Sequence, residues 1–478
     1  MSEIVAAYLP EFIIILFIIF NLTASLFFST YLYKLSKWVT LLGIVLAMAS
    51  TLYLQPETYA FNNTFLSNFY TLFFKILILM GGFFLTLLSR NMIREKRDRA
   101  FEYFSVFLSG ILFAMCALSA VDFVGLFVSL EALGLSCYLL LSLNKNPNAK
   151  QLTFGYLVQG AVVSALFLTG LSLIYGMCAQ FDFEQIGLFL VNSMHSGSQP
   201  QVLLTFSLIL MICTFLFKLG LAPFSSWLPD TFEGASYPIG AYMSTIPVLA
   251  CFGILSRILM IFLNYTFTMK IVLAFVAVIT IIFGSLSAIR QENLKRLMAY
   301  SMSVQSGIML LGLCVFTTYS LSSVLFYLFC YLFANIGAWS AIILLYNSAK
   351  LEKLEDLKGI IYHRPYYVIA FTVVLIALAG LAPTCGFVAK LYIFSAVARS
   401  GFIFLPFLII AMLGCVIMIY AYWRIIRAMF RRIETDIEID THVISSKFIL
   451  YGCALSTVAI CLIADRLIQF CQLVAYYM

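Results

Sequence analysis

Apolar segments of membrane-spanning length recur along this chain, and they constrain its fold more than any other feature. Runs of about 20 apolar residues alternate with short polar stretches. A helix of about 20 residues crosses the hydrocarbon core of a bilayer, whereas membrane β-strands alternate over about 10 residues. The chain is 63% hydrophobic and 10% charged, against about 25% charged residues in soluble domains. We therefore expect an all-α polytopic membrane protein.

The apolar runs predict about fourteen transmembrane helices in a single membrane domain, residues 1–478. The connections between the runs are short, which leaves no room for a separate soluble domain. The predicted spans cover residues 5–28, 37–55, 69–89, 102–120, 122–143, 152–177, 202–222, 238–262, 270–289, 297–317, 319–347, 367–396, 402–428 and 447–475.

Lysine and arginine concentrate in the loops that follow odd-numbered spans. The loop after the third span carries Arg90, Arg94, Lys96, Arg97 and Arg99. Positively charged loops stay on the cytoplasmic or matrix side, so we expect these loops to face that side. The net charge of +7 follows from this topology and does not indicate a nucleic-acid partner.

The letters GLAP occur twice, at Gly220–Pro223 and at Gly380–Pro383. Proline removes a backbone donor and clashes with the carbonyl one turn back, so spans 7 and 12 should break there. Broken helices at membrane depth occur only inside protein or beside a water-filled cavity. Because the two copies lie five spans apart, they run in opposite directions, as in the inverted repeats of transporters.

We therefore predict two inverted five-helix repeats, each with one broken helix. Residues 102–262 form the first repeat (spans 4–8) and residues 270–428 the second (spans 9–13). Residues 1–101 supply the first three helices, and residues 447–475 the last one.

Three ionisable residues lie deep in the apolar runs: Glu131, Lys218 and Lys390. A charge at mid-helix costs about 2.5–3.5 kcal/mol on insertion scales, so such residues are rare and usually functional. A lysine that moves toward or away from a carboxylate holds or releases a proton, which needs no cofactor. We predict a proton relay through these residues. A structural ion pair between two helices is the alternative for Glu131 and Lys218.

Other polar side chains at membrane depth could assist such a relay, although tyrosine in a membrane helix is more often ordinary packing. Glu11 and Lys75 lie near span ends, where we expect them to extend to the membrane surface. The twelve cysteines form no C-x-x-C pair and the three histidines are far apart, so we expect no metal or cofactor site. The possible helpers are Tyr138, Tyr242, Ser244, Tyr300, Ser303 and Tyr392.

Several stretches resemble the antiporter-like membrane subunits of respiratory complex I (NADH:quinone oxidoreductase) and their cation/proton antiporter relatives. They include "VGLFVSLEALGLSCYLL", "FKLGLAPFSSWLPDTFEGASYP" and the Q-x-N-x-K-R-L-x-A-Y-S run at Gln291–Ser301, and the likeness runs over roughly residues 65–430. Within this family the chain looks most like the N-type subunit, called subunit 2 in mitochondria. Lys390 stands where the M-type has glutamate, and the chain stops after the predicted fourteenth helix without the lateral helix of the L-type.

The resemblance implies that Glu131 and Lys218 form the pair of the first half-channel and that Lys390 is the exit-side relay. It implies a non-redox, proton-translocating subunit, with the NADH, flavin, iron–sulfur and quinone sites on partner subunits. The expected partners are a neighbouring antiporter-like subunit, small membrane subunits and membrane lipids. The expected location is an energy-converting membrane, and the high phenylalanine content favours the mitochondrial inner membrane over a bacterial plasma membrane.

The chain also departs from the family pattern at three positions. Gly155 and Val248 stand where the family usually has lysines, and Ser225 where it usually has histidine. Either water and hydroxyl groups replace the central lysine, or this half-channel conducts poorly; the retained Glu131 and Lys218 favour conduction. An Mrp-type cation/proton antiporter subunit and a structural complex I subunit without conduction are the alternative functions.

Overall fold

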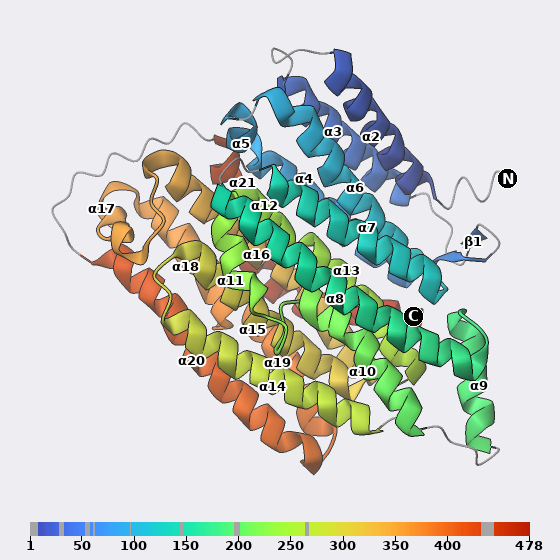
Figure 1. Ribbon diagram of the computed structural model, residues 1–478. Coiled ribbons are helices and arrows are strands. Elements are labelled where there is room, and N and C mark those ends of the chain that lie inside the picture. Colours follow the sequence, from blue (N-terminus) through green and yellow to red (C-terminus); the bar gives the residue numbers. More distant parts are fainter. Residues whose placement is uncertain are drawn as a thin grey trace.

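The computed structural model is mostly helical, as expected (Figure 1). Among the residues it describes, eleven helices are long and apolar enough to cross a membrane. Two shorter apolar helices, Val202–Lys218 and Pro365–Ala379, precede the two GLAP segments. The described residues are 8–27, 33–52, 58–60, 63–95, 97–143, 147–195, 201–262, 267–431 and 444–478.

The N-terminal part of the chain forms α2 (Leu9–Phe27), α3 (Tyr33–Thr51) and α4 (Phe69–Leu88). Between α3 and α4 lies an antiparallel hairpin of β1 (Thr58–Ala60) and β2 (Phe65–Ser67), which the sequence pattern did not predict. Strands of three residues are too short to produce a recognisable alternation of polar and apolar side chains.

The helices of residues 90–262 begin with a helix of six residues and end with a split helix. They are α5 (Arg90–Glu95), α6 (Ala100–Ser119), α7 (Phe123–Ser142), α8 (Pro147–Cys178), α9 (Phe183–His195), α10 (Gln201–Lys218), α11 (Trp227–Gly234), α12 (Tyr237–Met243) and α13 (Ile246–Phe262). The predicted span 238–262 is thus divided into α12 and α13. The division lies just before Pro247, which cannot donate a helical hydrogen bond.

The remaining described helices lie between residues 267 and 476. They are α14 (Phe267–Ile289), α15 (Leu294–Val315), α16 (Thr318–Ala349), α17 (Ile360–His363), α18 (Pro365–Ala379), α19 (Cys385–Arg399), α20 (Leu405–Phe430), α21 (Ile444–Leu462) and α22 (Ala464–Tyr476). The predicted last span, 447–475, is therefore divided between α21 and α22.

Both GLAP segments interrupt helices. One lies between α10 and α11, and the other between α18 and α19. Gly220 and Gly380 have φ values of 65° and 76°, in the left-handed region that favours glycine. A left-handed residue directly after a helix turns the chain away from the helix axis, and the following proline prevents the helix from resuming. Pro223 and Pro383 both follow cis peptide bonds.

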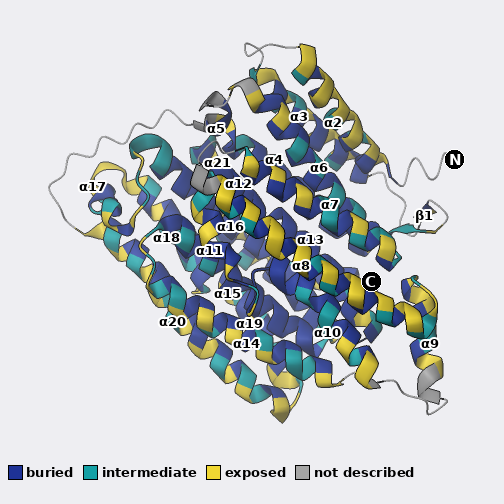
Figure 2. Cartoon of the chain, viewed as in Figure 1, coloured by how far each residue is buried: buried dark blue, intermediate teal, exposed yellow. Residues whose placement is uncertain are grey.

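The core lies in the middle of the bundle, around α15 and α16. Figure 2 shows buried residues there and exposed residues along the peripheral helices. In the most apolar window of α15, 94% of the residues are buried, against 28% for α2. The outward-facing side chains of the peripheral helices are themselves large and apolar, such as Phe154 and Leu413. This exterior suits lipid rather than water.

Glu11 and Lys75 do not extend to the membrane surface, so that expectation was wrong. Lys75 Nζ lies 2.7 Å from Glu11 Oε1, and their side chains are 0% and 6% exposed. The amine also lies 5.0 Å from the centroid of the Tyr8 ring. Helix α2 packs against α6, which packs against α4, so both side chains are enclosed by helices that sequence position does not reveal.

Candidate functional site

The first ionisable pair forms between α7 and α10. Lys218 is the last residue of α10, and its Nζ lies 3.9 Å from Glu131 Oε1. The amine also donates a hydrogen bond of 3.1 Å to the Leu130 carbonyl. A charge-assisted hydrogen bond is typically about 2.7–2.9 Å long, so the pair is in ionic contact without such a bond. A small movement of either side chain would close or open it.

Glycines create the space for this pair. A Cβ at Gly134 would lie 2.9 Å from Lys218 Nζ. A Cβ at Gly160, on α8, would lie 1.9 Å from the Tyr138 hydroxyl. The missing side chains therefore let the polar ends of Lys218 and Tyr138 approach the backbones of α7 and α8.

An aromatic cluster supports the first helix break. The Tyr156 ring stacks on Phe217 and Trp227, with centroid distances of 5.4 and 4.4 Å. It also contacts Tyr138 edge-on at 4.7 Å. The indole of Trp227 donates a 3.0 Å hydrogen bond to the Phe217 carbonyl. These contacts fix α11 against α8 and α10 and so hold Lys218 in place.

A second cluster of polar side chains lies between α6, α7 and α12. The Ser109 and Ser136 hydroxyls are 3.2 Å apart. Tyr242 is fully buried, and its hydroxyl has no hydrogen-bond partner among the described residues. This hydroxyl lies against Gly110, whose Cβ would be 2.0 Å away. A buried hydroxyl without a protein partner costs stability, and such groups are typical of functional sites.

Asn335, which was not among the predicted site residues, organises the centre of the bundle. Its Nδ2 donates hydrogen bonds to Ser244 Oγ at 2.9 Å and Thr245 Oγ1 at 3.0 Å. Tyr331 donates to the Ser244 carbonyl at 2.9 Å. These contacts satisfy backbone and side-chain groups at the division between α12 and α13. The signal available in the sequence was a single asparagine within the otherwise apolar run "FANIGAW".

Lys390 lies over the second helix break. Its Nζ donates to the carbonyls of Leu378 and Ala379 at 3.0 and 2.8 Å. These carbonyls end α18, where the helix dipole is negative and attracts a cation. A Cβ at Gly380 would lie 2.5 Å from Lys390 Cδ, so only glycine leaves room for the lysine here. The Lys390 side chain is buried.

A hydrogen-bonded network continues from Lys390 toward the centre. Gln305 Nε2 donates to the same Leu378 carbonyl at 2.9 Å and to the Tyr422 hydroxyl at 3.2 Å. Tyr327 donates to Gln305 Oε1. A cavity of about 10 Å³ adjoins Gln305, Tyr327 and Tyr331, which is roughly the space that one water molecule needs. Tyr327 and Tyr331 are one turn apart on α16, so this network adjoins the Asn335 contacts.

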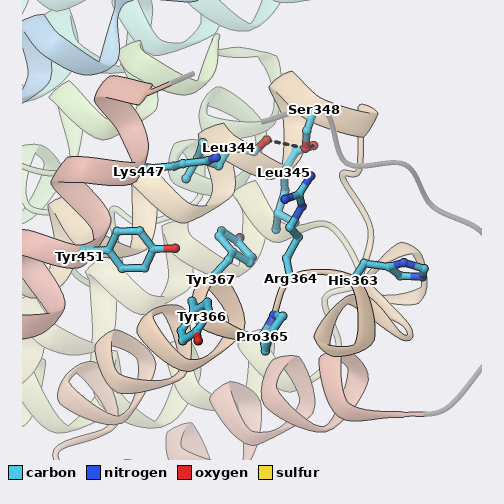
Figure 3. A pocket seen from close by; sticks show the side chains of 10 residues that line it. All are labelled: Leu344, Leu345, Ser348, His363, Arg364, Pro365, Tyr366, Tyr367, Lys447 and Tyr451. Carbon is cyan, nitrogen blue, oxygen red and sulfur yellow. Dashed lines mark hydrogen bonds between the residues drawn. The ribbon is translucent and has the colours of Figure 1, made fainter. Parts of the chain in front are cut away.

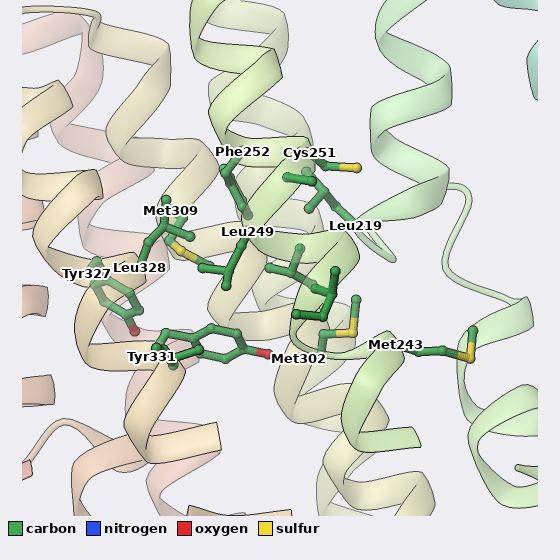
Figure 4. Packing of buried hydrophobic residues seen from close by; sticks show 14 of the residues in the cluster. Leu219, Met243, Leu249, Cys251, Phe252, Met302, Met309, Tyr327, Leu328 and Tyr331 are labelled. Carbon is green, nitrogen blue, oxygen red and sulfur yellow. The ribbon is translucent and has the colours of Figure 1, made fainter. Parts of the chain in front are cut away.

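Apolar side chains surround the centre of the bundle. Figure 4 shows Tyr327 and Tyr331 beside a packed cluster that includes Leu219, Leu249 and Met309. Val248, where the family has its central lysine, is fully buried. Its neighbours Leu249, Ala250 and Cys251 are also buried, so this stretch of α13 offers no hydroxyl or charged side chain.

The remaining predicted helpers lie in different places. Ser303 donates a 2.7 Å hydrogen bond to the Gly220 carbonyl and so supports the first break. Tyr392 lies near α22 instead, with its hydroxyl 3.3 Å from Asp465 Oδ1. Tyr300 is only partly buried and packs against the main core. Across the described residues, no group of three or more His, Cys, Asp or Glu could hold a metal ion.

Comparisons with known proteins agree with these features. The family described as "NADH:quinone oxidoreductase/Mrp antiporter, TM" matches residues 120–417. The NADH-quinone oxidoreductase subunit N of Bacillus anthracis is 32% identical, over 94% of this chain and 91% of that protein. The chloroplastic NAD(P)H-quinone oxidoreductase subunit 2 of Chlorokybus atmophyticus is also 32% identical, over 88% of this chain and 82% of the relative.

Solved structures share the fold. A chain of respiratory complex I from Thermus thermophilus superimposes with a TM-score of 0.80 and 25% identity, covering 96% of this chain and 98% of the other. A chain of the Mrp complex from Dietzia superimposes with a TM-score of 0.81 at 17% identity, and the match covers 99% of this chain and 97% of that chain. The preference for mitochondria finds no support in these bacterial and chloroplastic relatives. The chain belongs to the NADH:quinone oxidoreductase/Mrp antiporter family of membrane subunits.

Proposed function

We propose that this chain is the N-type membrane subunit of an NADH:quinone oxidoreductase and that it translocates protons through Glu131, Lys218 and Lys390. The contact of 3.9 Å between Glu131 and Lys218 carries the proposal, because a paired charge at membrane depth is usually functional. The relatives named subunit N and subunit 2 support the same assignment. Quinone reduction and NADH oxidation belong to partner subunits.

The chain crosses the membrane fourteen times in this proposal, with inverted repeats at residues 102–262 and 270–428. The two helix breaks at GLAP sequences, five spans apart, support the repeats. Residues 1–101 and 447–475 flank them within one domain, 1–478. The neighbours are another antiporter-like subunit and small membrane subunits of the same energy-converting membrane.

The Glu131–Lys218 pair acts as the proton switch. Two unit charges about 4 Å apart interact by about 4 kcal/mol at an effective dielectric constant near 20. Opening the pair removes this stabilisation, so that a proton can move on from the pair to the next polar group. Closing the pair restores the ionic contact. Changes in neighbouring subunits would drive the opening.

Hydroxyl groups carry the proton across the centre, where Val248 stands in place of a lysine. Ser244, Tyr331 and Tyr327 can each accept and donate a proton. Asn335 and Gln305 orient these hydroxyls through their amides. Lys390 receives the proton and passes it to the exit side.

Native electrophoresis of the source membrane in mild detergent tests the assignment to an NADH:quinone oxidoreductase. We expect this chain in a large band that stains for NADH dehydrogenase activity. A smaller band without NADH activity would contradict the assignment and would support an Mrp-type subunit instead. Sodium-dependent proton exchange in vesicles without NADH would then identify the antiporter.

A structural subunit without conduction is the second candidate, and buried Val248 is the observation that favours it. This alternative predicts that Lys390→Ala and Val248→Lys leave the number of protons pumped per NADH unchanged while assembly stays normal. Proton pumping in sealed vesicles, measured with quantified assembly, separates the two candidates.

A further inference from the structure

A pocket of about 300 Å³ lies at the ends of α16, α18 and α21 (Figure 3). Leu344 and Leu345 form its buried apolar part. The polar and aromatic side chains around it are Ser348, His363, Arg364, Tyr366, Tyr367, Lys447 and Tyr451. The residues of the proton-relay proposal are elsewhere, so the pocket is a separate feature.

The pocket has the charge of an anion-binding site. Arg364 and Lys447 line it, and none of its ten described lining residues is acidic. In Figure 3, Arg364 extends toward Ser348, and Lys447 reaches toward the end of α16. Helices α18 and α21 both begin here, and the positive ends of their dipoles add to the attraction for an anion.

The surroundings of the pocket suit a lipid rather than a soluble anion. The loops after α16 and α20 belong to the positively charged side of the predicted topology, which would put the pocket at the cytoplasmic or matrix surface of the membrane. Tyr366 and Tyr451 are exposed beside it, as interfacial tyrosines commonly are. Below Tyr451 on the same face of α21, Leu455 is 74% exposed and offers an apolar surface for an acyl chain.

We propose that this pocket binds the headgroup of an anionic phospholipid from the inner leaflet. The phosphate lies between Arg364 and Lys447, and the acyl chains follow the exposed face of α21. Basic pockets between transmembrane helices on this side are suited to such headgroups. The lipid would fix the start of α18, whose other end supplies the carbonyls that bind Lys390.

Photolabelling of the whole assembled complex tests the site. The delipidated complex is reconstituted in phosphatidylcholine vesicles that contain a photoreactive phosphatidylglycerol, and labelled peptides are mapped. We expect labels in residues 344–367 and 445–455. Unlabelled phosphatidylglycerol should compete, whereas phosphatidylcholine and inorganic phosphate should not.

Substitutions test the role of the two cations. Each of Arg364→Gln and Lys447→Gln should lower labelling about fivefold, because one cation beside an anionic lipid strengthens the binding of that lipid by about this factor. Arg427→Gln is the matched control, because it removes an exposed cation of the same side outside the pocket. Labelling in this control should not change.

Three results would overturn the proposal. Competition by phosphatidylcholine would mean that the charge plays no part, and competition by inorganic phosphate would indicate a phosphate site without lipid. Lipid labels on a partner subunit in place of these peptides would show that protein covers the pocket. The competition experiment uses the unaltered chain, so it decides the matter even if a variant fails to assemble.

Discussion

At the scale of single residues, buried lysines in this protein are held by backbone carbonyls as well as by acids. Lys218 donates to Leu130, and Lys390 donates to Leu378 and Ala379. A neutral lysine can keep a hydrogen bond to a carbonyl, whereas an ion pair requires the charge. In the proposed relay, these carbonyls would hold each amine in place whether or not it carries a charge.

Lys390→Met tests this role. The substitution removes the donor to two carbonyls at the end of α18, and an unsatisfied buried group costs about 1–3 kcal/mol. We expect the complex to assemble with a lower thermal stability and to lose most of its proton pumping. The exposed Lys34→Met, on α3, is the control and should change neither quantity. Normal pumping by Lys390→Met would exclude the lysine from the relay.

Gly134→Ala tests the space around Lys218. The added Cβ would lie 2.9 Å from Nζ, so the flexible amine has to move and the ion pair with Glu131 changes. We expect slower proton pumping at nearly unchanged stability. Gly176→Ala on α8 is the control, because a Cβ at that position would have no neighbouring atom within 4 Å. Equal pumping rates in the two variants would show that the amine position is not critical.

At the scale of helices, the two breaks use the same letters but place their lysines differently. Lys218 comes two residues before Gly220 and ends the first half of its helix, whereas Lys390 lies in the second half of its helix. The sequence predicted the breaks because glycine and proline act locally. It did not predict which carbonyls each lysine contacts, since those depend on how the halves fold back on one another.

The pair of Glu11 and Lys75 holds α2 against the bundle. Removing one partner of a buried ion pair costs about 3–5 kcal/mol, because the other charge is left uncompensated. We expect Lys75→Met and Glu11→Gln each to lower the thermal stability of the complex, and the double variant Glu11→Leu/Lys75→Met to recover much of it. Additive losses in the double variant would argue against a direct pair.

At the scale of the whole molecule, polar groups gather at the two helix breaks and at the division between α12 and α13, and Val248 is buried on α13. The lengths of the apolar runs predicted most helices within a few residues, and the charged residues Glu131 and Lys218 marked the first pair. The sequence did not predict the contacts of Asn335 and Gln305 or the buried Glu11–Lys75 pair. The partners in these contacts come from helices that are distant in sequence. Only tertiary packing brings such groups together.

Asn335→Leu tests whether the centre conducts. The substitution removes the amide that donates to the Ser244 and Thr245 hydroxyls. Both buried hydroxyls then lose this hydrogen bond. We expect proton pumping to fall several-fold while the NADH-active complex still assembles. Asn347→Leu, near the end of the same helix, is the control with the same change in side chain. Pumping that is equally retained in both variants would favour a subunit without conduction.

The most direct test of proton translocation by this chain is the pumping of protons per NADH oxidised by complexes that carry Glu131→Gln. The measurement uses sealed vesicles and equal amounts of assembled complex, with the exposed Glu102→Gln of α6 as the control. We predict that Glu131→Gln lowers proton pumping, together with quinone reduction, and that Glu102→Gln does not. Unchanged pumping in the Glu131→Gln complex would contradict a relay that begins at the Glu131–Lys218 pair.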